Sequence, residues 1–93
     1  MIARRVRAHG RVQGVGFRDA MVDAATLAGA QGWVRNRRDG TVEAVFRGPD
    51  DRVRQMLDLC RRGPPVARVD RVDVHPAEAG EAGQPGFEQR PTA

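Results

Sequence analysis

Hydrophobic side chains recur at two different periods along this chain, and the change of period separates strands from helices. In residues 2–9 they alternate with arginine and histidine, which is typical of a half-buried strand. Over residues 17–28 they return every three or four positions, which predicts a helix with one apolar stripe. The same spacing runs through residues 53–60, and Gly-Pro-Pro at 63–65 ends this second helix. Two amphipathic helices are therefore expected, each with one face to bury.

Turn signals bound the remaining strands. Asp39-Gly40 lies between two extended runs, residues 33–38 and 41–47, and predicts a hairpin. In the second run Val42, Ala44 and Phe46 alternate with Thr41, Glu43 and Arg47, so Glu43 is expected on a solvated face. Residues 69–75 predict a fourth strand, residues 76–86 a flexible loop, and residues 87–90 a short edge strand.

The order strand, helix, strand, strand, helix, strand predicts an α+β fold of the ferredoxin-like βαββαβ type. We expect one domain, residues 1–93, with both helices on one face of an antiparallel sheet and arginine-rich, solvated positions on the other. The first two strands should run parallel with another strand between them, so their carboxyl ends share one edge. The glycine-rich loop of residues 10–16 and Asn36 should therefore meet.

All sixteen basic residues are arginine, and the net charge is +4. Arginine pairs bidentately with phosphate, but a GC-rich coding sequence produces the same excess of arginine, alanine, glycine and proline. Only four aromatic residues are present, too few for an array of base-stacking rings. We expect no nucleic-acid partner.

Several absences narrow the remaining possibilities. No apolar run approaches the roughly 20 residues that cross a bilayer, and the basic N-terminus precedes no apolar segment of a signal peptide. A single cysteine, Cys60, suits a reducing compartment and lies in the helical stripe, where we expect it to pack in the core. We expect a cytoplasmic monomer without a metal, a cofactor or a membrane partner.

Candidate chemistry concentrates in residues 10–18, GRVQGVGFR. Glycines let successive N–H groups form an anion-binding concavity, the following helix N-terminus adds positive charge, and Arg18 can add a bidentate contact. An ordinary strand-to-helix turn with a solvated arginine is the plain alternative. The segment lacks the third glycine of the dinucleotide fingerprint and any Gly-Lys-Ser/Thr.

The segments GRVQGVGFR (10–18) and GWVRNRRDGTVEAVFRG (32–48) resemble the two motifs of the acylphosphatases, and the resemblance covers most of the chain. It implies metal-independent hydrolysis of acyl phosphates to a carboxylate and inorganic phosphate on a ferredoxin-like fold, without a cofactor. It also implies that Arg18 binds the phosphate and Asn36 orients the attacking water. The N–H groups that would cradle the phosphoryl oxygens are those of Arg11, Val12, Gln13, Gly14 and Val15.

Two features depart from that family's commonest pattern: Arg37 follows Asn36, and the terminal FEQRPTA lacks the aromatic residue that the family often has near its terminus. Two rival functions remain. One is a catalytically silent module that binds a phosphorylated metabolite or RNA through its arginine-rich face. The other is a detached domain of a larger carbamoyl-phosphate-handling protein, such as a hydrogenase-maturation factor, which would need further domains. The physiological acyl group is not determined by the sequence.

Other residues with candidate chemistry are expected to be structural. His9 precedes the loop, yet it has the position of an exposed strand residue, and His75 has no evident partner. Trp33 is expected to cover the open sheet face or to pack at the hairpin edge. Asp39 is expected to stabilise the turn.

Overall fold

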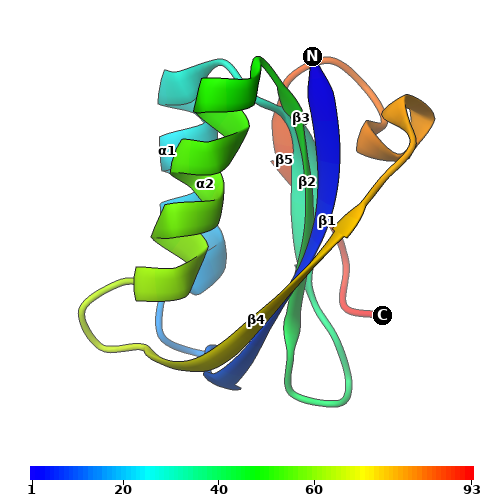
Figure 1. Ribbon diagram of the computed structural model, residues 1–93. Coiled ribbons are helices and arrows are strands. Elements are labelled where there is room, and N and C mark those ends of the chain that lie inside the picture. Colours follow the sequence, from blue (N-terminus) through cyan, green and yellow to red (C-terminus); the bar gives the residue numbers. More distant parts are fainter.

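Five strands form one sheet in the order β4-β1-β3-β2-β5, and both helices cover the same face of it (Figure 1). This computed structural model describes residues 1–93. The elements are β1 (Ile2–Arg11), α1 (Phe17–Ala28), β2 (Gln31–Asn36), β3 (Val42–Gly48), α2 (Asp50–Arg62), β4 (Arg68–Pro76), the short 3-10 helix η1 (Ala79–Ala82) and β5 (Phe87–Gln89). The predicted βαββαβ order and α+β class are confirmed.

The helices begin and end where the sequence supplies the appropriate residues. Helix α1 ends at Gly29, whose φ of 70° is left-handed and brings its N–H to the Ala25 and Thr26 carbonyls. Helix α2 begins after Pro49, with carboxylates in its first turn and arginines in its last, which complements the helix dipole. Neither helix is both long enough and apolar enough to cross a membrane.

Strand pairing places the first two strands parallel to each other. Strand β3 pairs antiparallel with both β1 and β2, so β1 and β2 run in the same direction with β3 between them. Their carboxyl ends therefore lie at the same end of the sheet, as expected from chain order. Strand β5 adds a parallel pair on the outer side of β2, and so confirms the short edge strand predicted there.

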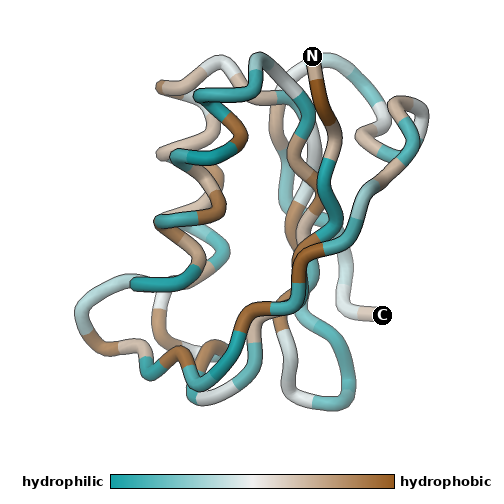
Figure 2. Tube along the Cα trace, in the orientation of Figure 1, coloured by the Kyte–Doolittle hydropathy of each residue, from teal (hydrophilic) through white to brown (hydrophobic).

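The main core lies between the helices and the sheet, where Figure 2 shows the hydrophobic positions of both layers facing one another. Phe46, Val53 and Met56 are fully buried there, and Phe87 stacks on Phe46 at 5.3 Å between ring centroids. Cys60 belongs to the same core, and burial raises the pKa of its thiol to about 12. The expected packing role of Cys60 is confirmed, because such a thiol stays protonated and inert.

The opposite face of the sheet is partly covered. The prediction of a flexible loop over residues 76–86 was wrong, because this segment contains helix η1. Helix η1 packs over this face, where Ala82 forms a second small core with Trp33 and Val45. The Trp33 indole Nε1 donates to the Glu81 carbonyl at 2.7 Å. Trp33 and Val45 need a cover on this face, and a reciprocal cap between Glu78 and Glu81 lets the segment supply one. Trp33 lies on this face as expected, but it is buried beneath η1 instead of covering an open face.

Candidate active site

The loop between β1 and α1 presents a row of free main-chain donors. None of the five N–H groups from Val12 to Gly16 donates a hydrogen bond within the protein. Gly14 and Gly16 have φ of 72° and 80°, a left-handed conformation that other residues rarely adopt. A Cβ on either glycine would meet nothing within 4 Å, so the space beside the loop is open. Residues 12–16, named the cradle below, therefore have the conformation and the free donors of an anion site.

A hollow of about 110 Å³ lies against the cradle at the N-terminus of α1. Its lining residues come from the loop and the first helical turn, and they are Val12, Gly14, Gly16, Phe17, Arg18 and Asp19. The N-terminus of the 12-residue helix α1 adds partial positive charge there. The hollow thus combines backbone donors, a helix dipole and one guanidinium.

Arg18 is free to meet a ligand. Its guanidinium takes part in none of the protein's ion pairs, unlike most of the other arginines. The adjacent carboxylate, that of Asp19, instead accepts a hydrogen bond from the Gln89 side chain. Asp19 therefore has a partner of its own, and Arg18 keeps its full hydrogen-bonding capacity.

Asn36 lies at the carboxyl end of β2, between β3 on one side and the C-terminal segment on the other. It pairs with Val42 of β3, and its carbonyl accepts the Ala93 N–H at 3.1 Å. Its side-chain Oδ1 is buried and has no hydrogen-bond partner in the protein. Leaving such an oxygen unpaired costs about 1–3 kcal/mol, which is typical of a group that serves a function rather than the fold.

The cradle and the segment after Asn36 are joined by one side chain, that of Gln13. Its Nε2 donates to the Arg37 carbonyl at 2.7 Å and to the Thr41 carbonyl at 2.9 Å. The loop and the end of β2 therefore meet, as the strand order predicts. Asn36 does not line the hollow itself.

The other predicted site residues take distinct positions. Arg11 is the last residue of β1, opposite Arg68 of β4, and its N–H precedes the row of free donors. Val15 is half-buried against the main core. The roles assigned to Arg11, Val12, Gln13, Gly14, Val15, Arg18 and Asn36 stay predictions.

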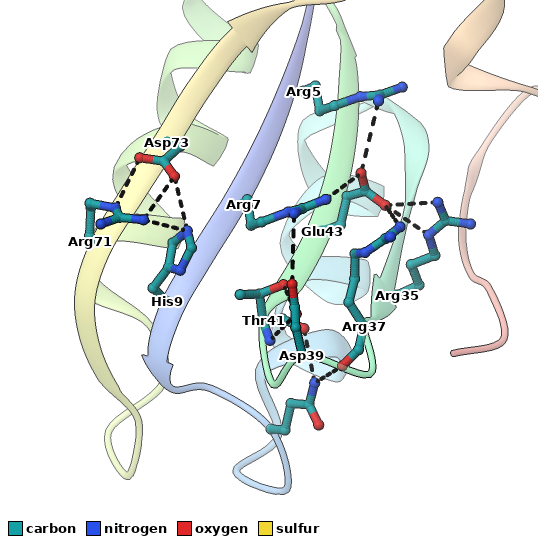
Figure 3. Close-up of polar contacts among 11 residues, drawn as sticks. Arg5, Arg7, His9, Arg35, Arg37, Asp39, Thr41, Glu43, Arg71 and Asp73 are labelled. Carbon is teal, nitrogen blue, oxygen red and sulfur yellow. Dashed lines mark hydrogen bonds and ion pairs between the residues drawn. The ribbon is translucent and has the colours of Figure 1, made fainter. Parts of the chain in front are cut away.

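Sequence reasoning missed a buried carboxylate on the second face of the sheet. Glu43 is only 2% exposed, so its expected exposure was wrong. Four arginines surround its carboxylate within 4 Å, and Figure 3 shows that they come from β1, β2 and the hairpin turn. These arginines are Arg5, Arg7, Arg35 and Arg37, and together with Glu43 they form the Glu43 cluster.

Strand register explains the burial of Glu43. Arg7 lies directly opposite it across β1 and β3, and Arg35 lies directly opposite it across β2 and β3. Burial alone would raise the pKa of Glu43, but hydrogen bonds and charge from Arg35 and Arg37 outweigh it, so the pKa lies below its usual value. Alternation in each strand was visible in the sequence, whereas the register that aligns these residues was not.

Two polar groups near the site have structural partners. His9 contacts the Asp73 carboxylate at 2.9 Å, so it faces β4 rather than the cradle. The Asp39 carboxylate accepts hydrogen bonds from the Thr41 hydroxyl at 2.6 Å and the Thr41 N–H at 3.0 Å, and these bonds lower the pKa of Asp39. The expected turn role of Asp39 is confirmed.

The side chains that commonly bind metals do not gather. No group of three or more His, Cys, Asp or Glu side chains is placed to hold a metal ion. At the cradle, the contacts that the protein offers to an anion are the free N–H groups and the Arg18 guanidinium.

Comparison with known proteins assigns this geometry to one family. The sequence profile described as Acylphosphatase matches residues 4–88. An acylphosphatase of Acidovorax sp. (strain JS42) is 53% identical over 91 residues, which are 98% of this chain and 92% of the relative. A crystal structure of acylphosphatase from Bacillus subtilis superposes with a TM-score of 0.89 at 33% identity, over 97% of this chain and 99% of that chain. A crystal structure of T. kodakarensis HypF gives a TM-score of 0.79 at 30% identity, over 96% of this chain but 12% of that chain. With both motifs, the fold and the profile in agreement, the chain belongs to the acylphosphatase family.

Proposed function

We propose that the cradle, Arg18 and Asn36 carry out hydrolysis of the carboxyl–phosphate bond of an acyl phosphate to a carboxylate and inorganic phosphate. One observation carries these roles: five free N–H groups, an unpaired arginine and an unpaired buried amide oxygen lie at one end of the sheet. Family membership supports the reaction itself. We treat residues 1–93 as one domain with this single site.

Substrate binding is assigned to the cradle and Arg18. The N–H groups of Val12 to Gly16 donate to the phosphoryl oxygens, and the planar guanidinium of Arg18 adds a two-pronged contact. Phosphoryl transfer spreads negative charge over these oxygens, so fixed donors around them stabilise the transition state without having to reorganise.

Water activation is assigned to Asn36 and needs no strong base. The Asn36 Oδ1 accepts a hydrogen bond from the water, while the amide NH₂ donates one to the phosphoryl group. The water oxygen forms a bond to phosphorus as the phosphorus–oxygen bond to the acyl group breaks. The carboxylate leaves with that electron pair, and the water proton passes to solvent. A carboxylate is a good leaving group, so orientation and charge stabilisation are sufficient.

The rival function, phosphate or RNA binding through the arginine-rich sheet face, is less well supported. Most of the arginines on that face are bound to carboxylates: Arg5, Arg7, Arg35 and Arg37 surround Glu43, and Arg71 pairs with Asp73. Arg5 also pairs with Glu81 and Arg7 with Asp39, so each of these arginines has a carboxylate partner within the protein, whereas Arg18 has none.

Substituting Asn36 by alanine tests this mechanism. Turnover of benzoyl phosphate should fall about 10²-fold, because an interaction made chiefly in the transition state is lost. Inhibition by inorganic phosphate should change within about twofold, since the cradle and Arg18 remain. Steady-state kinetics with circular dichroism measures both, and Gln55→Ala, an exposed side chain without hydrogen bonds, is the matched control.

Near-normal turnover in Asn36→Ala, or phosphate affinity lost in step with turnover, would contradict the assigned role. The assays contain EDTA, because no cluster of metal-binding side chains is present and activity should survive chelation. Activity that disappears in EDTA and returns with Mg²⁺ would contradict the metal-free mechanism.

A monomer in the cytoplasm, without a nucleic-acid partner, is the setting that we propose. The exposed large hydrophobic residues are Met1 before β1, Leu27 in α1 and Val66 between α2 and β4, which are far apart in the sequence and suggest no interface. The single thiol is buried and protonated, which suits a reducing compartment. Light scattering that gives the molar mass of two chains would contradict the monomer.

A further inference from the structure

The side chain of Gln13 makes the only direct hydrogen bonds from the cradle to the β2-β3 hairpin. Both acceptors are main-chain carbonyls, those of Arg37 and Thr41, so the amide nitrogen must face them and both of its hydrogens are used. This is a side-chain contact, separate from the Gln13 N–H that belongs to the cradle. It acts on the segment that directly follows Asn36.

The hairpin segment that Gln13 holds is itself firmly fixed. The Arg37 N–H donates to the Thr41 carbonyl at 2.8 Å, and the Gly40 N–H donates to the Arg37 carbonyl at 3.1 Å. Figure 3 shows the Arg37 guanidinium on the Glu43 carboxylate and Asp39 bound to Thr41. The amide of Gln13 therefore connects the loop to a rigid body that includes the end of β2.

The cradle has little else to fix it on this side. Val12 is buried in the main core and Val15 packs against it, but Gly14 and Gly16 are exposed and rotate more freely than other residues. Without the Gln13 contact, the free N–H groups can still bind phosphate, yet their position relative to Asn36 is no longer held.

We propose that Gln13 is a positioning residue, whose side-chain amide sets the distance and orientation between the phosphate-binding cradle and the water-orienting Asn36. This inference rests on the proposed roles of the cradle and Asn36. Misplacement by about 1 Å can cost on the order of 10²-fold in rate, so alignment of this kind acts mainly on turnover. Phosphate, which contacts only the cradle and Arg18, depends on it much less.

Gln13→Met is the first test, because methionine has a similar length and no hydrogen-bond donor. Turnover of benzoyl phosphate should fall on the order of 10-fold or more, up to about 10²-fold. Inhibition by inorganic phosphate should change by less than about threefold, because the variant loses one contact that orders the loop but no group that donates to phosphate. Gln13→Glu keeps the shape but sets oxygens against two carbonyls, so its loss of turnover should be larger. Gln55→Met is the control for the substitution itself.

A double-mutant cycle with Asn36→Ala separates alignment from general loosening of the loop. If Gln13 acts by aligning the cradle with Asn36, Gln13→Met should cost no more than about twofold once Asn36 is absent. An equal fold loss in both backgrounds would overturn the inference and leave the proposed function intact. Near-normal turnover in Asn36→Ala alone would overturn the proposed role of Asn36 and this inference with it.

Discussion

Arginine has opposite surroundings in two regions of this protein. Beside the cradle, Arg18 stands at a helix N-terminus without any carboxylate partner, and the N–H groups around it are also free. In the Glu43 cluster, Arg35 and Arg37 contact one buried carboxylate at 2.8 and 3.1 Å. The first region is charged and unsatisfied, and the second is charged and satisfied.

This difference shows what distinguishes a site from a structural cluster of the same residue type. An anion approaching the Glu43 cluster would compete with a carboxylate that is already in place and desolvated. An anion approaching Arg18 can accept hydrogen bonds from its guanidinium and from N–H groups that have no partner within the protein. The number of arginines in a region therefore predicts anion binding poorly. Whether an arginine lacks a carboxylate partner within the protein predicts it better.

Arg18→Lys should produce the largest effect of the changes that test this comparison. Lysine keeps the charge but replaces the planar fork with a single point donor, so kcat/KM should fall about 10²- to 10³-fold and phosphate inhibition should weaken. Steady-state kinetics with acetyl phosphate measures both. Arg62→Lys, at an exposed arginine that also has no partner, should change neither. Undiminished phosphate inhibition of the Arg18 variant would show that Arg18 is not the phosphate ligand.

Glu43→Gln should have a smaller effect, and on stability rather than on phosphate binding. Removing the charge leaves four arginines facing each other around a buried amide, which should lower the free energy of unfolding by about 3 kcal/mol, the low end for breaking a buried pair. The arginines can turn partly to solvent, since their side chains are 26–42% exposed. Urea unfolding measures this change.

Phosphate inhibition separates the two regions in the same variant. In folded Glu43→Gln, the inhibition constant for inorganic phosphate should stay within about twofold of that of the unmodified protein, because no residue of the Glu43 cluster lines the hollow. Stability unchanged by the substitution would mean that the cluster contributes nothing to the fold.

Much of the fold could be predicted from local pattern. The helical stripes end at Gly29 and at Gly63, and Asp39-Gly40 marks the hairpin turn, so each boundary has a residue-level signal. The covering helix η1 had no such signal. Its cap uses Glu78 rather than Ser, Thr, Asp or Asn, and its purpose depends on Trp33 and Val45, which are distant in sequence.

The candidate site was only partly predictable for a similar reason. Glycines before a helix indicate an anion site, and strand order brings Asn36 to the same end. Burial of Glu43 depends on the register of three strands, and the Gln13 contact depends on how the loop curls back over the hairpin. Both are long-range geometry, which no short-range spacing encodes.

The smallest expected effect is a change in how stability depends on pH. The pKa of Glu43 in the folded protein lies below its ordinary value of 4.5, so both states are ionised above about pH 4.5 and its contribution is then complete. As the pH falls further, the unfolded chain takes up the proton first, and the contribution is lost as the pH passes through the folded pKa. Each proton changes the slope by at most about 1.4 kcal/mol per pH unit. Asp39 and Asp73 also have lowered pKa values and remain in Glu43→Gln, so their common contribution cancels in the difference, apart from any change at Asp39, which shares Arg7 and Arg37 with Glu43. Urea unfolding from pH 6 down to pH 3 should therefore show a steeper acid loss for the unmodified protein than for the variant, whereas parallel curves would mean that the arginines do not hold Glu43 ionised.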